Sequence, residues 1–169
     1  VSGTDRLGEV AERMDADVLV NVQGDEPLIE GRVIDAAVAA LAADAGAAMA
    51  TVAHALPASA LADRNRVKVC VDEGGRATRF ARSLRPDEAR GALQHVGVYA
   101  YRRAFLLELV GWPESEGERR EQLEQLRALE RGCPVAVAVI ERWHSVPVDV
   151  PDDVARVEAA LREREGGDR

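Results

Sequence analysis

Apolar residues recur along this chain at two spacings, one typical of strands and one typical of helices. Short apolar runs predict six strands, at residues 17–23, 47–53, 67–72, 76–82, 94–101 and 134–141. The wider spacing predicts four helices, at residues 5–14, 31–44, 118–131 and from Pro151 onward. Because strands and helices alternate, we expect a three-layer α/β domain with a mainly parallel sheet.

Two regions show a more detailed pattern. Residues 67–82 predict a hairpin insertion, because Glu73-Gly74-Gly75 falls between two apolar runs. In residues 94–101 the even-numbered residues share one face, and the odd-numbered residues, among them His95 and Tyr99, share the other. We expect the first face to be core and the second to be able to receive a ligand.

The composition indicates a globular chain, with 169 residues of which 47% are hydrophobic and 31% charged. The formal net charge of −8 disfavours nucleic acids and anionic membranes as partners, because their phosphates require basic surfaces. No apolar run approaches a membrane-spanning length, and no signal peptide opens the chain. We expect a cytoplasmic protein without a nucleic-acid or membrane partner, and with Cys70 and Cys133 as free thiols.

No repeat, low-complexity tract or shift in composition divides the chain. We expect a single domain over residues 1–161, followed by a polar tail at residues 162–169 that frays from the last helix. The chain opens on Val1, in residues that resemble the interior of a motif. We therefore expect an N-terminally truncated chain.

Candidate chemistry first appears where a predicted strand ends. The motif Gln23-Gly24-Asp25-Glu26-Pro27 follows the apolar run at residues 17–22, and substrates of open α/β sheets bind at strand ends. Gly24 lets a ligand approach the backbone, and the Asp25 carboxylate is a hard oxygen donor suited to Mg²⁺. Taken alone, the motif is equally compatible with a solvated turn. Asp149 precedes the last helix, so its alternative role is to cap the start of that helix.

Three other kinds of site are excluded by missing patterns. The sequence has no Gly-x-Ser-x-Gly elbow of a serine hydrolase, and no Gly-x-x-x-x-Gly-Lys phosphate loop. Its Cys and His residues also lack the paired spacing of a zinc site.

Six short motifs occur in order: Ser2-Gly-Thr-Asp-Arg6, Asn21-Val-Gln-Gly-Asp-Glu-Pro27, Val67-Lys-Val69, His95-Val-Gly-Val-Tyr99, Leu123-Glu-Gln-Leu-Arg127 and Val148-Asp149 with Pro151. This series covers nearly the whole chain and resembles the 3-deoxy-manno-octulosonate (Kdo) cytidylyltransferases, also called CMP-Kdo synthetases. The resemblance implies a Rossmann-like nucleotidyltransferase fold and a homodimer. It also implies transfer of CMP from CTP to Kdo, with release of pyrophosphate, for lipopolysaccharide assembly.

The resemblance also implies roles for individual residues. Asp25 and Asp149 match the two aspartates that hold the catalytic Mg²⁺. The positions that surround the sugar acid are matched by Gln23, Arg82, His95, Tyr99, Glu124 and Gln125. The segment containing Ser2, Gly3, Thr4 and Arg6 falls in the nucleotide-binding region. We expect His95 to donate a hydrogen bond to the carboxylate or the hydroxyls of the sugar acid.

The chain departs from the family pattern in several places. The family begins with a segment that this sequence lacks. In the family, that segment bears an Arg- and Lys-containing loop that binds the triphosphate. Ala81 stands where the family has Ser, Val150 stands where it has a capping Thr, and residues 83–93 are shorter than expected. Two alternatives stay open: a relative that activates another keto sugar acid, such as 8-amino-Kdo or a sialic-acid-like sugar, and a non-catalytic dimerising remnant.

Overall fold

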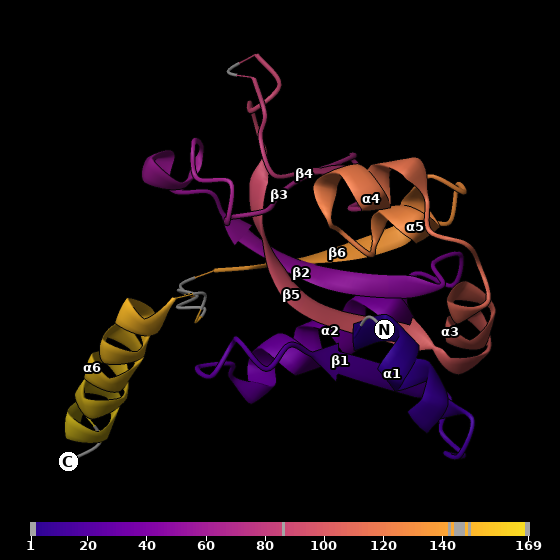
Figure 1. Ribbon diagram of the computed structural model, residues 1–169, viewed down its shortest axis with the longest axis horizontal. Coiled ribbons are helices and arrows are strands. Elements are labelled where there is room, and N and C mark those ends of the chain that lie inside the picture. The colour runs from indigo at the N-terminus through magenta and orange to yellow at the C-terminus, as the bar shows by residue number, and fades with distance from the viewer. Residues whose placement is uncertain (1–2, 86, 142, 144–147, 149, 168–169) are drawn as a thin grey trace.

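Six strands form one mixed sheet, with helices on both of its faces (Figure 1). The computed structural model describes residues 3–85, 87–141, 143, 148 and 150–167, and of residues 163–167 it describes only the helical backbone. The strands are β1 (Val18–Val22), β2 (Met49–Ala55), β3 (Lys68–Val71), β4 (Ala77–Ala81), β5 (Leu93–Arg102) and β6 (Val135–Ile140). The helices are α1 (Gly3–Ala11), α2 (Gly31–Ala43), η1 (Ala58–Ala60), α3 (Arg103–Val110), α4 (Glu116–Glu121), α5 (Leu126–Leu129) and α6 (Pro151–Gly167).

The sheet has the strand order β4-β3-β5-β2-β6, and β1 also pairs with β5. Within the described residues, β2 and β6 form the single parallel pair, while the other four pairs are antiparallel. The prediction of a mainly parallel sheet is therefore wrong, although the hairpin of β3 and β4 is confirmed. The physical reason is that β5 runs against all three of its neighbours, and the alternation of side chains carries no information about strand direction.

Each face of the sheet carries its own apolar core. On one face, Val33 and Leu41 of α2 pack in a cluster with Val96 of β5. On the other face, α1, α3 and the α4–α5 segment cover a cluster that includes Tyr101 and Leu106. The predicted alternation of β5 is confirmed, but both of its faces are core over much of its length. The part that can receive a ligand is limited to the region around His95.

β1 and β3 lie end to end along one edge of β5. β1 pairs with residues 98–102, and β3 pairs with residues 93–94. The amide of His95 donates to the carbonyl of Val67 at 2.9 Å, which extends the pairing beyond the end of β3. On this edge, residues 96–97 of β5 therefore lie between two ladders that do not meet.

The segment 118–131 forms two short helices, so the single helix predicted there is wrong. α4 begins with a capping box made by Ser115 and Glu118, and ends at Gln122, which adopts a left-handed conformation with φ of 55°. Arg82 of the neighbouring hairpin donates to the carbonyls of Glu121, at 2.6 Å, and Gln122, at 3.2 Å. The end of α4 leaves these carbonyls without helical partners, and a side chain from elsewhere in the fold satisfies them.

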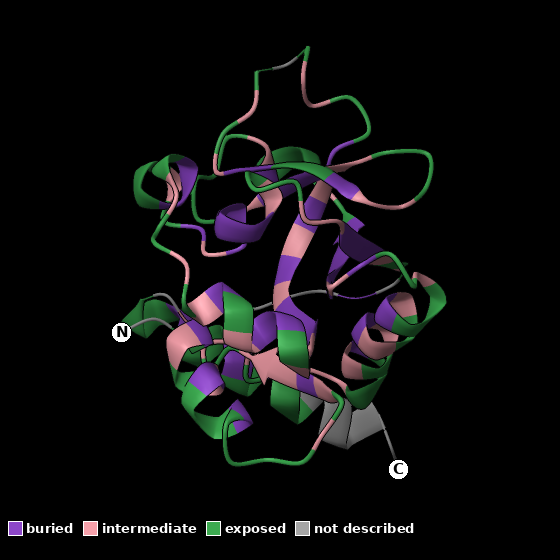
Figure 2. Ribbon diagram, turned by 90° about the vertical axis from the view of Figure 1, so that its right-hand side faces the viewer, coloured by how far each residue is buried: buried purple, intermediate pink, exposed green. Residues whose placement is uncertain are grey.

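α6 lies to one side of the sheet (Figure 1). It continues to Gly167, so residues predicted as a frayed tail belong to the helix. None of the described helices is long and apolar enough to cross a membrane. Residues 83–85 and 87–91, in the loop at the top of Figure 2, are exposed or half-buried. Cys70 and Cys133 are free thiols, as predicted.

Candidate functional site

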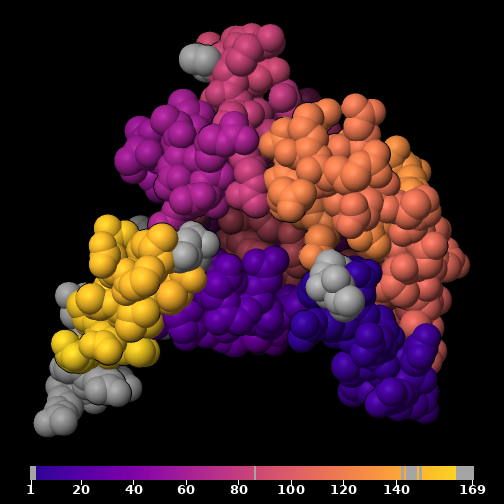
Figure 3. Space-filling model, viewed as in Figure 1, coloured from indigo at the N-terminus to yellow at the C-terminus, as the bar shows by residue number. Residues whose placement is uncertain are grey.

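A cleft of about 700 Å³ opens where the two ladders along β5 fail to meet. Its walls come from α1, the residues after β1, the residues before β3, the first half of β5 and the segment between α4 and α5. Figure 3 shows the hollow between the orange α4–α5 layer and the indigo N-terminal residues. A second cavity, of about 500 Å³, lies beside β6 and includes Asp44 and Arg76, but none of the predicted site residues.

The floor of the cleft is the backbone of β5 at Gly97. A methyl group at this position would lie 2.8 Å from Oε1 of Gln23, which is too close for an undisturbed contact. The Gln23 side chain therefore lies directly over Gly97, and a larger residue at this position would have to displace it. This contact places the Gln23-Gly24-Asp25-Glu26 segment at the wall of the cleft, as predicted from its position after a strand.

Asp25 is suited to hold a cation. Its Oδ1 atom is buried and has no hydrogen-bond partner within the described part of the chain. The amide of Val148 donates to the carbonyl of Asp25 at 2.8 Å, so the residue before Asp149 lies against the Asp25 backbone. Asp149 itself lies outside the described residues. The described residues contain no group of three or more His, Cys, Asp or Glu side chains that could hold a metal. This donor set fits Mg²⁺, which is commonly held by one or two carboxylates together with substrate phosphates.

His95 lines the cleft between two aromatic rings. Its ring centroid lies 5.3 Å from those of both Phe80 and Tyr99, and its Nε2 atom lies 2.9 Å from the hydroxyl oxygen of Thr51. Burial lowers the pKa of His95 to about 3, because the charged imidazolium would lose its hydration. His95 is therefore neutral near pH 7. Burial likewise raises the pKa of Tyr99, which keeps its phenol protonated.

Gln125 offers an unused hydrogen-bond donor in the cleft. Its side chain is buried and its Nε2 atom has no partner within the described residues. Leaving such a donor without a partner destabilises the folded protein, so a ligand oxygen in the cleft is its natural partner. This observation agrees with the predicted sugar-side position of Gln125.

Glu124 has a structural role that sequence reasoning missed. One of its carboxylate oxygens accepts from the amide of Gly3 at 3.3 Å, and the other accepts from the amide of Thr4 at 3.1 Å and from the Thr4 hydroxyl. The carboxylate therefore caps the N-terminus of α1 and offsets the positive end of its dipole. A capping partner 120 residues away in the sequence carries no local signal.

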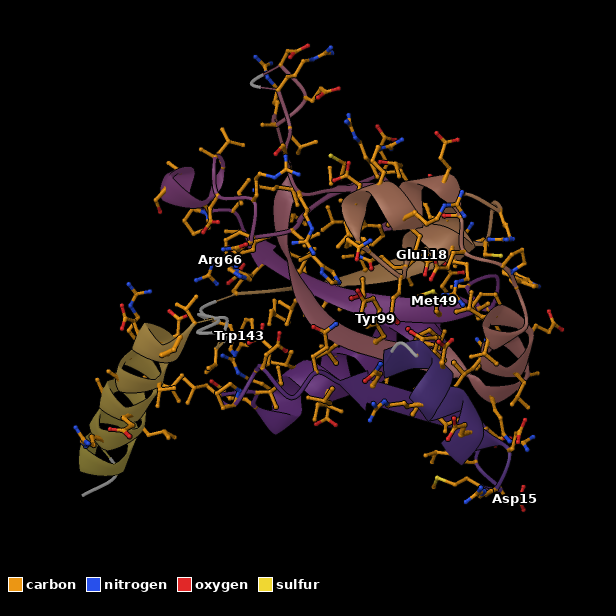
Figure 4. The ribbon with its side chains drawn as sticks, viewed as in Figure 1. Asp15, Met49, Arg66, Tyr99, Glu118 and Trp143 are labelled. Atoms are coloured by element: carbon orange, nitrogen blue, oxygen red, sulfur yellow. The ribbon has the colours of Figure 1, made fainter. Side chains whose placement is uncertain are left out.

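Three arginines and three carboxylates line the cleft, namely Arg6, Arg66, Arg82, Asp25, Glu26 and Glu124. The Arg82 guanidinium is occupied by the carbonyls of Arg64, Glu121 and Gln122. Arg66, which Figure 4 labels, was not predicted. Its closest ion-pair contact within the described residues is 3.9 Å, to Asp63. Its position just before the Val67-Lys-Val69 motif is the one signal that could have revealed it. Arg66 and Arg6 therefore have guanidinium donors available to an anion.

The structure thus gathers most of the predicted residues at one cleft. Those that line it are Gly3, Arg6, Gln23, Asp25, Arg82, His95, Tyr99, Glu124 and Gln125. Thr4 is buried behind the cleft wall and acts through its bonds to Glu124. Ser2 and Asp149 lie outside the described residues.

Comparisons with known proteins identify the family of this chain. Residues 1–141 match the family model described as cytidylyltransferase. A 3-deoxy-manno-octulosonate cytidylyltransferase of Syntrophotalea carbinolica is 46% identical over 175 residues, covering 95% of this chain and 70% of that protein. The enzyme of the same name from Geobacter sulfurreducens is 44% identical over 178 residues, with the same two coverages.

Two solved structures show where the fold is shared. A CMP:2-keto-3-deoxy-manno-octonic acid synthetase complexed with CTP superposes with a TM-score of 0.87 and 37% identity, covering 96% of this chain and 69% of that one. A putative glucose-1-phosphate thymidylyltransferase from Bacillus anthracis has a TM-score of 0.62 with 15% identity, covering 94% of this chain and 60% of that one. The second match shows a likeness of fold alone.

Proposed function

The chain belongs to the cytidylyltransferase family, and on this premise we propose that it transfers CMP from CTP to Kdo, giving CMP-Kdo and pyrophosphate for lipopolysaccharide biosynthesis. The observation that carries the proposal is the cleft on β5. It brings Gln23, His95 and Gln125 together from three separate elements, beside a carboxylate suited to Mg²⁺.

The reaction requires the anomeric hydroxyl of the sugar to attack the α-phosphate of CTP while pyrophosphate leaves. We infer that Asp25 and Asp149 would hold the Mg²⁺ at the end of β1, with Asp25 presenting its unpartnered Oδ1 atom. When bound, Mg²⁺ offsets charge on the phosphate oxygens and lowers the pKa of a coordinated hydroxyl. The protein's own contribution is to orient the two substrates in line across the cleft.

The sugar acid is proposed to lie against β5 and the α4–α5 segment. Gln125 donates to one of its oxygens through the buried Nε2 atom, and Tyr99 and His95 form the wall behind it. Arg66 and Arg6 supply positive charge for its carboxylate or for the phosphates, because Arg82 is already bound to three carbonyls.

A homodimer in the cytoplasm completes the proposal. Exposed apolar side chains support a second copy as partner, since Val139 of β6 is 56% exposed and Val154 of α6 is 46% exposed. Sedimentation of the complete gene product tests this point. A dimer is expected, with a shift towards monomer in Val154→Glu; a wild-type monomer would contradict it.

The direct test is an assay of the complete gene product with CTP, Mg²⁺ and a panel of sugar acids, followed by ³¹P spectroscopy of the nucleotide. We expect CMP-Kdo to form with Kdo as the preferred acceptor. A preference for 8-amino-Kdo or a sialic acid would favour the related sugar specificity. No turnover with any acceptor, in protein that is folded and dimeric, would favour a non-catalytic remnant.

A further inference from the structure

Thr51 occupies an irregular point in the sheet directly behind His95. The register between β2 and β5 shifts here, since Thr51 pairs with Tyr99 but the next residue, Val52, pairs with Val96. Two residues of β5 are thus accommodated in a bulge, which disrupts the regular ladder of backbone hydrogen bonds. The Thr51 hydroxyl fills the gap, because it lies 2.8 Å from the carbonyl of Val98 and 3.3 Å from that of Val96.

The hydroxyl has one proton and three close neighbours. Two of them, the carbonyl oxygens of Val96 and Val98, can only accept a hydrogen bond. If the proton pointed to Nε2 of His95 instead, the Thr51 oxygen would face the Val98 oxygen at 2.8 Å with no hydrogen between them. The consistent arrangement has Thr51 donating to Val98, and Nε2–H of His95 donating to the Thr51 oxygen.

We propose that Thr51 is a positioning residue that holds His95 in its Nε2–H tautomer, so that Nδ1 faces the bound sugar acid as a hydrogen-bond acceptor. Within the described part of the chain no group hydrogen-bonds to Nδ1, and it is not among the buried unpartnered atoms, which leaves it available in the cleft. Phe80 and Tyr99 hold the ring in place, with Phe80 edge-on at an interplanar angle of 86°.

This assignment changes the chemistry expected of His95. An unprotonated ring nitrogen accepts a hydrogen bond from a hydroxyl group but repels a carboxylate, which has no hydrogen to donate. His95 would therefore recognise a hydroxyl of the sugar, while the carboxylate binds the arginines or Gln125. The recognition step rests on the proposed function, whereas the tautomer is a property of the protein without ligand.

The tautomer can be read by two-bond ¹H–¹⁵N correlation spectra of the uniformly ¹⁵N-labelled complete gene product, without substrate, near pH 7.5. Protonated and bare ring nitrogens resonate far apart, and His95→Gln identifies the signals that belong to His95. Thr51→Val removes the hydroxyl at nearly constant shape. Thr51→Ser keeps the hydroxyl and is the matched control.

We expect wild type and Thr51→Ser to show a single neutral tautomer with the proton on Nε2, and Thr51→Val to show a mixture. A wild-type spectrum with the proton on Nδ1 would overturn the inference, even if Thr51→Val failed to fold. In kinetic assays, Thr51→Val should raise KM for Kdo roughly tenfold, the effect of one lost hydrogen bond, with KM for CTP little changed and Thr51→Ser restoring the wild-type value.

Addition of Kdo should also shift the Nδ1 resonance towards the hydrogen-bonded range. If Kdo bound without moving this resonance, the recognition step would be wrong. If the tautomer were as expected but no CMP-Kdo formed, the proposed function would fail while the assignment of Thr51 would stand.

Discussion

The two halves of β5 are built differently although they belong to one strand. Residues 98–102 are paired with β1 along one edge, and residues 99–101 are paired with β2 along the other. In the first half, residues 93–97, β2 stays paired along one edge, although a bulge shifts the register. Along the other edge the pairing strand changes from β1 to β3, and the two ladders leave an opening at residues 96–97. The closed half is core apart from Tyr99, which reaches the cleft, and the open half forms the rest of the β5 wall of the cleft.

The difference shows how a sheet makes a site. An interrupted ladder leaves backbone and side-chain polar groups that must be satisfied by other means. Here the Thr51 hydroxyl donates to the carbonyl of Val98 and lies 3.3 Å from that of Val96, and the Gln23 side chain lies over Gly97. The same interruption provides the space in which Asp25 and Gln125 keep polar atoms without a protein partner.

The largest effect is expected at the open half, from Asp25→Asn. This change removes the carboxylate charge at constant volume, and loss of the metal's stabilisation of the transition state should lower kcat roughly a thousandfold or more. The melting temperature should stay close to that of wild type. Asp35→Asn, an exposed change on α2, is the matched control. Unchanged Mg²⁺-dependent turnover in Asp25→Asn would contradict the role of Asp25.

The closed half should respond in stability rather than in chemistry. Val98 is fully buried against the α2 face, so Val98→Ala should lower the free energy of unfolding by roughly 2 kcal/mol through lost burial and a residual cavity. Denaturant titration measures this loss. Met14→Ala, at a position 47% exposed, should cost little. If Val98→Ala left stability intact but impaired Kdo binding, the separation of the two halves would be wrong.

A methyl group at Gly97 tests the close crossing of Gln23. Gly97→Ala should displace the Gln23 side chain and raise KM for the sugar acid about tenfold, the size of one lost polar contact. Gly31→Ala is the control, because a methyl group there meets nothing within 4 Å. Equal kinetics in both variants would show that Gln23 does not depend on this contact.

A smaller effect concerns the dependence of stability on pH. Because the pKa of His95 falls from 6.5 to about 3 on folding, the unfolded chain binds one more proton between these values. The neutral ring therefore makes its full contribution to the free energy of unfolding above pH 6.5. This contribution is lost as the pH falls towards 3, by no more than about 1.4 kcal/mol per pH unit. His95→Gln should flatten the profile of unfolding free energy between pH 6.5 and 4. Parallel profiles for both proteins would show that His95 is not neutralised by burial.

The sequence predicted the parts of this molecule that depend on local patterns. The two faces of β5, the hairpin of β3 and β4 and the α2 stripe all follow from spacing, and the ordered motifs located most of the cleft. Helix α3 was not predicted. The break at Gln122 was not predicted either, because the Arg82 side chain that binds the carbonyls there lies 40 residues away in the sequence. The antiparallel course of β5 and the cap that Glu124 provides for α1 also depend on tertiary contacts, which periodicity does not encode.

Backbone amide shifts along β5 test the central account most directly. The complete gene product, labelled with ¹⁵N, would be titrated with Kdo and CTP in the presence of Mg²⁺, and the amide shift changes compared along the whole strand. The account predicts the largest changes at residues 95–97 and at Gln23, with small changes at residues 100–102. Changes centred instead on residues 100–102, or around Asp44 and Arg76 at the second cavity, would contradict it.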